Sequence, residues 1–155
     1  MKAFDKIPHL RLIHKLEKYQ ITGQFSGWIR SFLLGRKQRV IVNGEKSEWR
    51  DVTSGIPQGS VLGPILFVLY INEMPEVTSV GTHTYLFADD TKAFRGIFQQ
   101  SDCVGLQMDI HALQGWSDKW LLCFHPEKCK AMRIGKSRIE KMDYHQWSMQ
   151  NQRKI

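Results

Sequence analysis

Hydrophobic residues recur at three- and four-residue spacings in several stretches, the pattern of helices with one buried face. Residues 9–19 follow this pattern and are predicted to form an amphipathic helix, with Lys15 on its solvent side. Residues 24–34 are predicted to form a second helix, ended by Gly35, which can take the left-handed conformation that closes helices. Residues 101–120 are predicted to form another amphipathic helix.

Other stretches alternate apolar and polar residues or end in turn signals, which favours strands. Residues 40–42, the turn Asn43-Gly44 and residues 49–53 predict a hairpin, because Asn-Gly supplies the positive φ angles of tight turns. Residues 82–87 alternate, as does the stretch after Asp90, so Ala88-Asp89-Asp90 is predicted to lie at a hairpin turn. Residues 130–134 resemble a short strand.

Glycine and proline are dense between residues 55 and 64, which marks a shaped loop. The loop leads into an apolar segment, residues 65–71, predicted to be a buried helix with Pro64 in its first turn. Ser60 is positioned to cap this helix. Nothing repeats at a fixed period, and no internal segment has the composition of a linker. The simplest fold prediction is one compact α+β unit.

Composition fits a globular protein: 42% of the 155 residues are hydrophobic, and the length suits one domain. The net charge of +7 favours a polyanionic partner, although a soluble basic surface explains the charge equally well. Cys103, Cys123 and Cys129 match neither a paired disulfide framework nor a zinc motif, and they predict a reduced, intracellular protein. The longest apolar run, residues 61–71, is about half of the ~20 residues of a membrane span.

Three motifs carry the candidate chemistry: KAFDKIPH from residue 2, SGIPQGSVLGPILFVLYIN from residue 54, and FADD from residue 87. Their order and spacing resemble the palm region of reverse transcriptases of non-LTR (LINE-type) retrotransposons. The resemblance covers residues 2–144 and is most specific at PQGS and FADD. It implies a palm-like antiparallel sheet packed against helices, and template-directed addition of deoxynucleotides to a primer. The implied partners are an RNA template, a DNA primer and dNTP.

Asp89 and Asp90 are the candidate metal ligands, since two neighbouring carboxylates at a hairpin tip can hold divalent ions for phosphoryl transfer. By resemblance they match the aspartates that bind two Mg²⁺ ions. A pair of Asp residues is also common in solvated turns. An unrelated two-metal phosphatase or nuclease is disfavoured, because the chain offers no His and Asp cluster of the kind such sites use.

The resemblance assigns nucleotide-binding roles to three more residues. Gln58 and Gly59 match the loop that lies against the templating base and the incoming nucleotide, where a glycine lets the backbone approach closely. Phe4 matches the bulky residue under the nucleotide sugar that excludes a ribose 2′-hydroxyl. The alternatives are a Gly/Pro loop that only leads into a helix and an ordinary core aromatic.

Basic residues complete the candidate set. Lys128, in HPEKCK, resembles a lysine thought to protonate the pyrophosphate, with a solvated surface lysine as the alternative. Arg36, Lys37 and Arg39 fall where the family contacts nucleic-acid backbone, or they form a solvated basic edge strand. The tryptophans Trp28, Trp116 and Trp120 are predicted to pack in the core, because they lie within helical periodicity.

The family's first catalytic carboxylate lies five residues before the position of Phe4, two places upstream of Met1. Asp5 is poorly placed to replace it, because neighbouring residues of a strand face opposite sides, so Asp5 is expected to be structural or to pair with Lys6. The expectation is therefore a partial palm domain, residues 1–144, with little activity in isolation and a disordered tail, residues 145–155. The alternative is a non-catalytic nucleic-acid-binding remnant of a retroelement.

Overall fold

The computed structural model describes residues 3–135. The chain divides into two compact units, residues 2–72 and residues 73–155, where the sequence predicts one. Each unit combines helices with short antiparallel strand pairs, so the α+β prediction is confirmed. None of the described helices is long and apolar enough to cross a membrane. The boundary expected at residue 144 and the tail expected at residues 145–155 lie outside the described residues.

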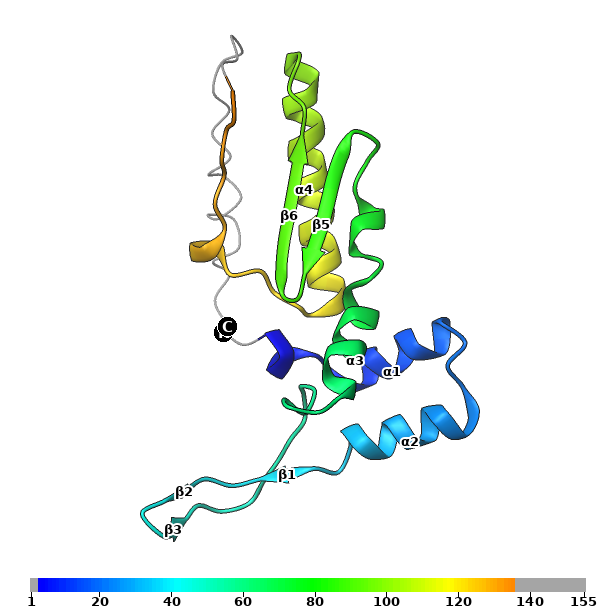
Figure 1. The fold of residues 1–155 in the computed structure, drawn as a ribbon, viewed down its shortest axis with the longest axis vertical. Coiled ribbons are helices and arrows are strands. Elements are labelled where there is room, and N and C mark those ends of the chain that lie inside the picture. The colour runs from blue at the N-terminus through cyan, green and yellow to red at the C-terminus, as the bar shows by residue number, and fades with distance from the viewer. Residues whose placement is uncertain (1–2, 136–155) are drawn as a thin grey trace. The chain divides into compact units, whose positions relative to one another are not determined.

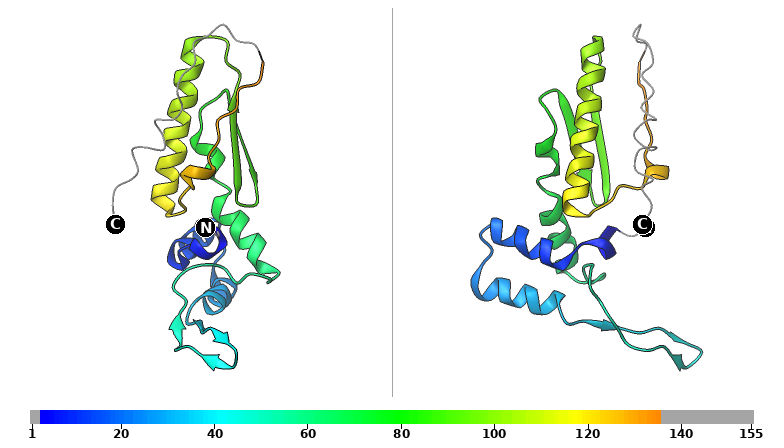
Figure 2. Two further views of the ribbon diagram at one scale, coloured as in Figure 1. Left: turned by 90° about the vertical axis from the view of Figure 1, so that its left-hand side faces the viewer. Right: turned by 180° about the vertical axis from the view of Figure 1, so that it is seen from behind.

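Three α-helices build the first unit: α1 (His9–Lys18), α2 (Gly23–Leu33) and α3 (Leu62–Ile71), preceded by a 3₁₀ turn, η1 (Ala3–Lys6). In Figures 1 and 2, α1 and α2 lie side by side and are joined by a short connection. All three helices match the predicted ones, and α3 starts three residues earlier than expected. Their apolar faces form the core of this unit, which includes Leu12, Leu16, Ile29, Leu33, Leu66, Phe67 and Tyr70.

Lys15 corrects the prediction for α1, because its side chain is fully buried instead of facing solvent. Its ammonium group donates to the carbonyl of Tyr70 and lies 4.9 Å from the centre of the Tyr70 ring. Burying a charged group is costly unless it is paired, and these contacts compensate part of the cost. Lys15 therefore ties α1 to the end of α3.

A two-stranded arm leaves the helices of the first unit between α2 and α3 (Figure 1). At its base β1 (Lys37–Gln38) pairs with β4 (Arg50–Asp51), and at its tip β2 (Ile41–Val42) pairs with β3 (Glu45–Lys46). The Asn43-Gly44 turn is confirmed, with φ of 51° and 86°. The return strand, however, starts at Glu45 instead of Trp49.

The register shifts by one residue along this arm. Two residues separate β1 from β2, whereas three separate β3 from β4, so the return strand carries one extra residue between positions 46 and 50. Such a bulge strengthens local twist and redirects side chains. Every residue of the four short strands is exposed.

The second unit contains one hairpin and one long helix. A 3₁₀ turn, η2 (Met74–Val77), leads into β5 (Thr82–Phe87), which pairs with β6 (Asp90–Arg95), and α4 (Gln100–Trp120) follows. Figures 1 and 2 show α4 running along one face of the β5–β6 ribbon. A short 3₁₀ turn, η3 (Pro126–Lys128), lies near the end of the described residues. The predicted hairpin and helix are confirmed.

Three sequence expectations differ from the structure. Residues 130–134 form no strand, because no described segment pairs with them. Trp116 and Trp120 are buried as predicted, but Trp28 is exposed on α2, stacked between Phe25 and Phe32. Instead of one continuous sheet, the described strands form three separate two-stranded pairs.

Candidate active site

The two aspartates lie at the tip of the β5–β6 hairpin. Phe87 pairs with Asp90, so Ala88 and Asp89 form the two-residue turn. Ala88 has φ of +50°, whereas Asp89 does not have a positive φ, so the first residue of the turn carries the conformation that favours glycine. Both carboxylates are exposed, and neither makes a hydrogen bond or ion pair with another described residue. The turn therefore presents two oxygen-donor groups to the surroundings.

The hairpin is fixed to α4 by the buried carboxylate of Asp109. Asp109 accepts hydrogen bonds from Thr82 Oγ1 (2.5 Å) and from the amide (2.7 Å) and hydroxyl (2.9 Å) of Ser79. Arg95 Nη1, at the end of β6, lies 3.4 Å from the same carboxylate. Burial alone would raise the pKa of Asp109, but the hydrogen bonds from Thr82 and Ser79, together with Arg95, lower it below its ordinary value.

A second carboxylate holds Arg95 and the start of α4. Asp102 Oδ2 accepts hydrogen bonds from the backbone amides of Phe98 and Gln99, both at 3.0 Å, and these bonds lower the pKa of Asp102. Asp102 Oδ1 lies 3.9 Å from Arg95 Nε. The sequence interpretation missed Arg95 and Asp109. Their signal was a charged residue at position 109 on the apolar face of a predicted helix.

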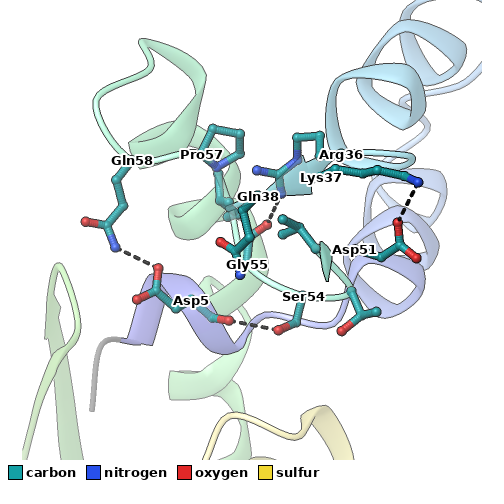
Figure 3. Close-up of a pocket in the computed structure, with 12 residues that line it drawn as sticks. Asp5, Arg36, Lys37, Gln38, Asp51, Ser54, Gly55, Pro57 and Gln58 are labelled. Carbon is teal, nitrogen blue, oxygen red and sulfur yellow. Dashed lines mark hydrogen bonds and ion pairs between the residues drawn. The ribbon is translucent and has the colours of Figure 1, made fainter. Parts of the chain in front are cut away.

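The PQG loop of the first unit is held against η1. Gln58 Nε2 donates to Asp5 Oδ1 (2.7 Å), Ser54 Oγ donates to the Asp5 carbonyl (2.9 Å), and the amide of Ile56 donates to the Phe4 carbonyl (2.9 Å). Figure 3 shows the Gln58 side chain directed at Asp5. Asp5 is therefore structural, as expected, but its partner is Gln58, not Lys6.

All three predicted nucleotide-binding residues lie at or beside this loop. The Phe4 ring stacks on the Phe67 ring of α3, with centroids 4.3 Å apart, and Phe4 remains partly exposed. Gln58 and Gly59 are exposed, and Gly59 has φ of +79° with open space where a Cβ would stand. Ser60 Oγ accepts a hydrogen bond from the Gly63 amide (2.9 Å), which confirms its capping role at α3.

The base of the loop rests on His9 and Arg36. His9 Nε2 lies 2.8 Å from the Gly55 carbonyl, to which Arg36 Nη2 also donates (2.7 Å). Since a carbonyl only accepts, His9 Nε2 carries the proton, and its 3.3 Å approach to Arg36 is not a hydrogen bond. Burial lowers the pKa of His9, as does the Arg36 charge to a smaller extent, whereas the bond to Gly55 opposes this.

A pocket of about 700 Å³ opens between η1, the loop and the base of the arm (Figure 3). It is lined by Asp5, Arg36, Lys37, Gln38, Asp51, Val52, Thr53, Ser54, Gly55, Ile56, Pro57 and Gln58. The Arg36 guanidinium is engaged by two carbonyls of the protein, because its Nε also donates to the Leu33 carbonyl (3.0 Å). Lys37 is exposed and only 3.8 Å from Asp51. Arg36 was predicted to act with Lys37 and Arg39, but in the structure it differs from them by linking the end of α2 to the PQG loop.

Lys128 is the last residue of η3 and is exposed. It belongs to the same unit as Asp89 and Asp90, whereas Phe4, Gln58, Gly59, Lys37 and Arg39 belong to the other unit. No group of three or more His, Cys, Asp or Glu side chains that could hold a metal occurs among residues 3–135. The FADD motif makes Asp89 and Asp90 the metal-ligand candidates, and the structure places both carboxylates at an exposed hairpin tip.

Comparison with protein families decides the assignment. The model of the family described as "Reverse transcriptase (RNA-dependent DNA polymerase)" matches residues 1–153. The chain belongs to the reverse transcriptase family. This confirms the resemblance noted from the KAFDKIPH, PQGS and FADD motifs.

The relatives of this reverse transcriptase segment are polymerases of non-LTR retrotransposons. It is 34% identical over 137 residues to the RNA-directed DNA polymerase from mobile element jockey of Drosophila melanogaster, and 31% identical over 131 residues to the probable RNA-directed DNA polymerase from transposon X-element of the same species. These matches cover 83% and 82% of the chain. The chain spans only 15% and 14% of the length of those two relatives.

A third relative is 38% identical over 90 residues, which is 57% of the chain and 9% of the relative. It is the Retrovirus-related Pol polyprotein from type-1 retrotransposable element R1 of Bradysia coprophila.

Proposed function

We propose that this chain is a segment of an RNA-directed DNA polymerase that extends a DNA primer along an RNA template through a palm-like two-metal site. One observation carries the proposal: within a chain matched by the reverse transcriptase family, a tight turn exposes two adjacent carboxylates that bond to no other described residue. An Asp that only stabilises a turn commonly accepts hydrogen bonds from nearby backbone amides, and neither Asp89 nor Asp90 does so.

Asp89 and Asp90 would hold the Mg²⁺ ions. The fit rests on donor chemistry, since Mg²⁺ prefers oxygen ligands and commonly takes one or two carboxylates together with substrate phosphates. Bound there, Mg²⁺ would supply the charge that activates the primer 3′-hydroxyl and stabilises the pyrophosphate leaving group. The protein anchors the hairpin that carries them, because Asp109 and Arg95 fix its open end, opposite the turn, to α4.

The residues of the first unit would form the nucleotide and template contacts. The partly exposed Phe4 ring, stacked on Phe67, would lie under the nucleotide sugar, and Gly59 would let the backbone approach the ligand. Gln58 would present its Oε1 acceptor, because its Nε2 is engaged by Asp5. Lys37 and Arg39 would contact phosphates, and Lys128 would hold a proton at Nζ for the leaving pyrophosphate.

Metal binding by the 155-residue chain tests the site without requiring turnover. Mn²⁺, titrated as a paramagnetic stand-in for Mg²⁺, should broaden the backbone NMR signals of residues 87–91 first. The Asp89→Asn and Asp90→Asn variants should each weaken this broadening, whereas Asp118→Asn, an exposed carboxylate of α4, should not. Equal broadening at all exposed carboxylates would contradict the proposed site.

We also propose that the isolated chain does not sustain primer extension, because residues 1–155 supply two of the three carboxylates of the family pattern. Mg²⁺-dependent extension by the purified chain, lost in Asp89→Asn, would contradict this.

A second candidate function is nucleic-acid binding without catalysis, which the exposed basic arm favours. Binding that is sensitive to salt but indifferent to Mg²⁺ and to Asp89→Asn would support it over the polymerase proposal.

A further inference from the structure

The arm of the first unit exposes an aromatic side chain that its own fold leaves uncovered. Trp49 is 56% exposed, and it lies at the bulge between β3 and β4. A two-stranded ribbon cannot bury side chains between layers, so a large ring on it stays accessible unless another element packs there. The Trp49 side chain therefore keeps a large accessible surface beyond its contacts within the arm.

Arg39 holds the ring from the opposite strand. Its guanidinium carbon lies 4.5 Å from the centre of the Trp49 ring, a cation–π contact across the arm. The bulge accounts for this pairing, because the extra residue redirects the side chains of the return strand. One ring face is therefore supported by a cation, while more than half of the side chain remains accessible.

The surroundings of this Arg39–Trp49 pair are basic. Lys37, Lys46 and Arg50 are exposed on the four short strands, together with Arg39 beside them. Carboxylates at Glu45, Glu48 and Asp51 offset part of this charge, so the arm favours a polyanion without being uniformly basic. An aromatic platform flanked by cations is the combination that binds unpaired bases by stacking and their phosphates by charge.

We infer that Trp49, supported by Arg39, stacks on an unpaired base, so that the arm binds single-stranded nucleic acid in preference to duplex. This inference rests on the proposed nucleic-acid-binding function and adds a stacking residue to it. A duplex offers its phosphates to the cations but keeps its bases stacked on one another, so it cannot use the Trp49 ring.

The test measures binding of a fluorescently labelled single-stranded RNA, and of the matching duplex, to the 155-residue chain. Trp49→Ala should weaken single-strand binding by roughly five- to a hundred-fold, the range of one lost base stack. Trp49→Phe should keep most of the affinity. Trp28→Ala is the matched control, because Trp28 is a similarly exposed tryptophan (51%) that lies on α2.

Salt dependence separates stacking from charge. Trp49→Ala removes no charge and should leave the slope of log K against log salt unchanged, whereas Arg39→Gln should reduce the slope by roughly 0.7. Intrinsic fluorescence should be quenched by the single strand in the wild type and in Trp28→Phe, and much less in Trp49→Phe. This readout does not require Trp49→Ala to fold.

Several outcomes would overturn the inference. Unchanged affinity in Trp49→Ala with strong binding by the wild type would remove the stacking role and leave the proposed function intact. Equal loss in Trp28→Ala would point to a general effect of removing a tryptophan. Conversion of a dimer to a monomer by Trp49→Ala, with RNA binding unchanged, would assign the surface to a second copy. Failure of the wild type to bind any nucleic acid would contradict the proposed function as well.

Discussion

Ala88 holds a backbone conformation that its own side chain disfavours. Its φ of +50° places it in the left-handed region, where an L-residue with a Cβ costs roughly 1–2 kcal/mol. Glycine avoids this cost but loses roughly 0.5–1 kcal/mol through the entropy of the unfolded chain. Ala88→Gly should therefore raise the free energy of unfolding by about 0.5–1 kcal/mol, measured by urea titration.

The control for this substitution is Ala93→Gly in β6, where the backbone is that of a strand. There the entropy term acts alone, so stability should fall by about 0.5–1 kcal/mol. Destabilisation of equal size at both positions would show that the turn carries no strain. Strain at Ala88, directly before the two candidate metal ligands, is of the kind that clusters at functional sites.

Alanine substitutions at Gly55 and Gly59 distinguish the cost of backbone strain from the cost of steric crowding. Both have positive φ, at +89° and +79°. A Cβ on Gly55 would stand 2.8 Å from the Asp5 Cα and 2.9 Å from the Asp5 carbonyl oxygen, whereas a Cβ on Gly59 meets nothing within 4 Å. Gly59→Ala should lower the free energy of unfolding by about 0.5–1 kcal/mol, which is the conformational cost less the entropy that alanine removes from the unfolded chain. Gly55→Ala should cost more, by roughly 1–3 kcal/mol, because backbone must move.

Hydrogen exchange at the amide of Ile56 checks where this effect acts, because that amide donates to the Phe4 carbonyl. Faster exchange in Gly55→Ala than in Gly59→Ala would locate the damage at the contact between η1 and the PQG loop. Equal costs for the two variants would contradict the crowding argument.

At the scale of elements, the buried carboxylate of Asp109 links α4 to both strands of the β5–β6 hairpin. Asp109→Asn would lose the ion pair with Arg95 and weaken the hydrogen bonds from Ser79 and Thr82. The expected cost is about 2–4 kcal/mol, typical of breaking a buried charged network. Thermal unfolding measures it, with Asp118→Asn on the exposed face of α4 as the control.

The same carboxylate makes stability depend on pH. Because the pKa of Asp109 is lower in the folded protein than its ordinary value of 3.8, its contribution is fully present above that value. The contribution is lost as pH falls below 3.8 and through the lower folded pKa. Asp109→Asn should therefore flatten the acid limb of the stability curve, and an unchanged acid limb would contradict the role given to Asp109.

Sequence patterns predicted the elements of this chain better than the contacts between them. Helices α1, α2 and α4 and the β5–β6 hairpin follow from periodicity and turn chemistry, which are local properties. Lys15 escaped prediction because its burial depends on the Tyr70 carbonyl, fifty-five residues away. The Gln58–Asp5 bond escaped for the same reason, with a separation of fifty-three residues. The periodicity of the sequence does not predict contacts between residues so far apart in the chain.

In the candidate site, the motifs predicted which residues carry the chemistry but not which contacts those residues make. FADD and PQGS located the carboxylates and the loop, because their residue types carry the chemistry. Arg36 looked equivalent to Lys37 and Arg39 in the sequence, yet it is anchored to Leu33 and Gly55. The sequence alone does not show whether an arginine side chain bonds to carbonyls of the protein or extends into solvent.

At the scale of the whole molecule, the basic charge is unevenly distributed. Residues 2–72 carry eleven Lys and Arg against five Asp and Glu, whereas residues 73–155 carry eleven against ten. Nearly all of the net charge of +7 therefore belongs to the unit that carries the arm. Attraction to a polyanion should be governed by this unit, because each phosphate contact releases counterions.

Charge reversal in each unit tests this distribution. Lys37→Glu with Arg39→Glu should weaken RNA binding strongly and reduce the slope of log K against log salt by roughly 1.4, as expected for two lost contacts on a single strand. Lys119→Glu with Lys130→Glu changes the net charge equally in the other unit, and both residues are exposed. If binding followed net charge alone, the two double variants would weaken it equally. A much larger loss in the first would show that the arm makes the phosphate contacts.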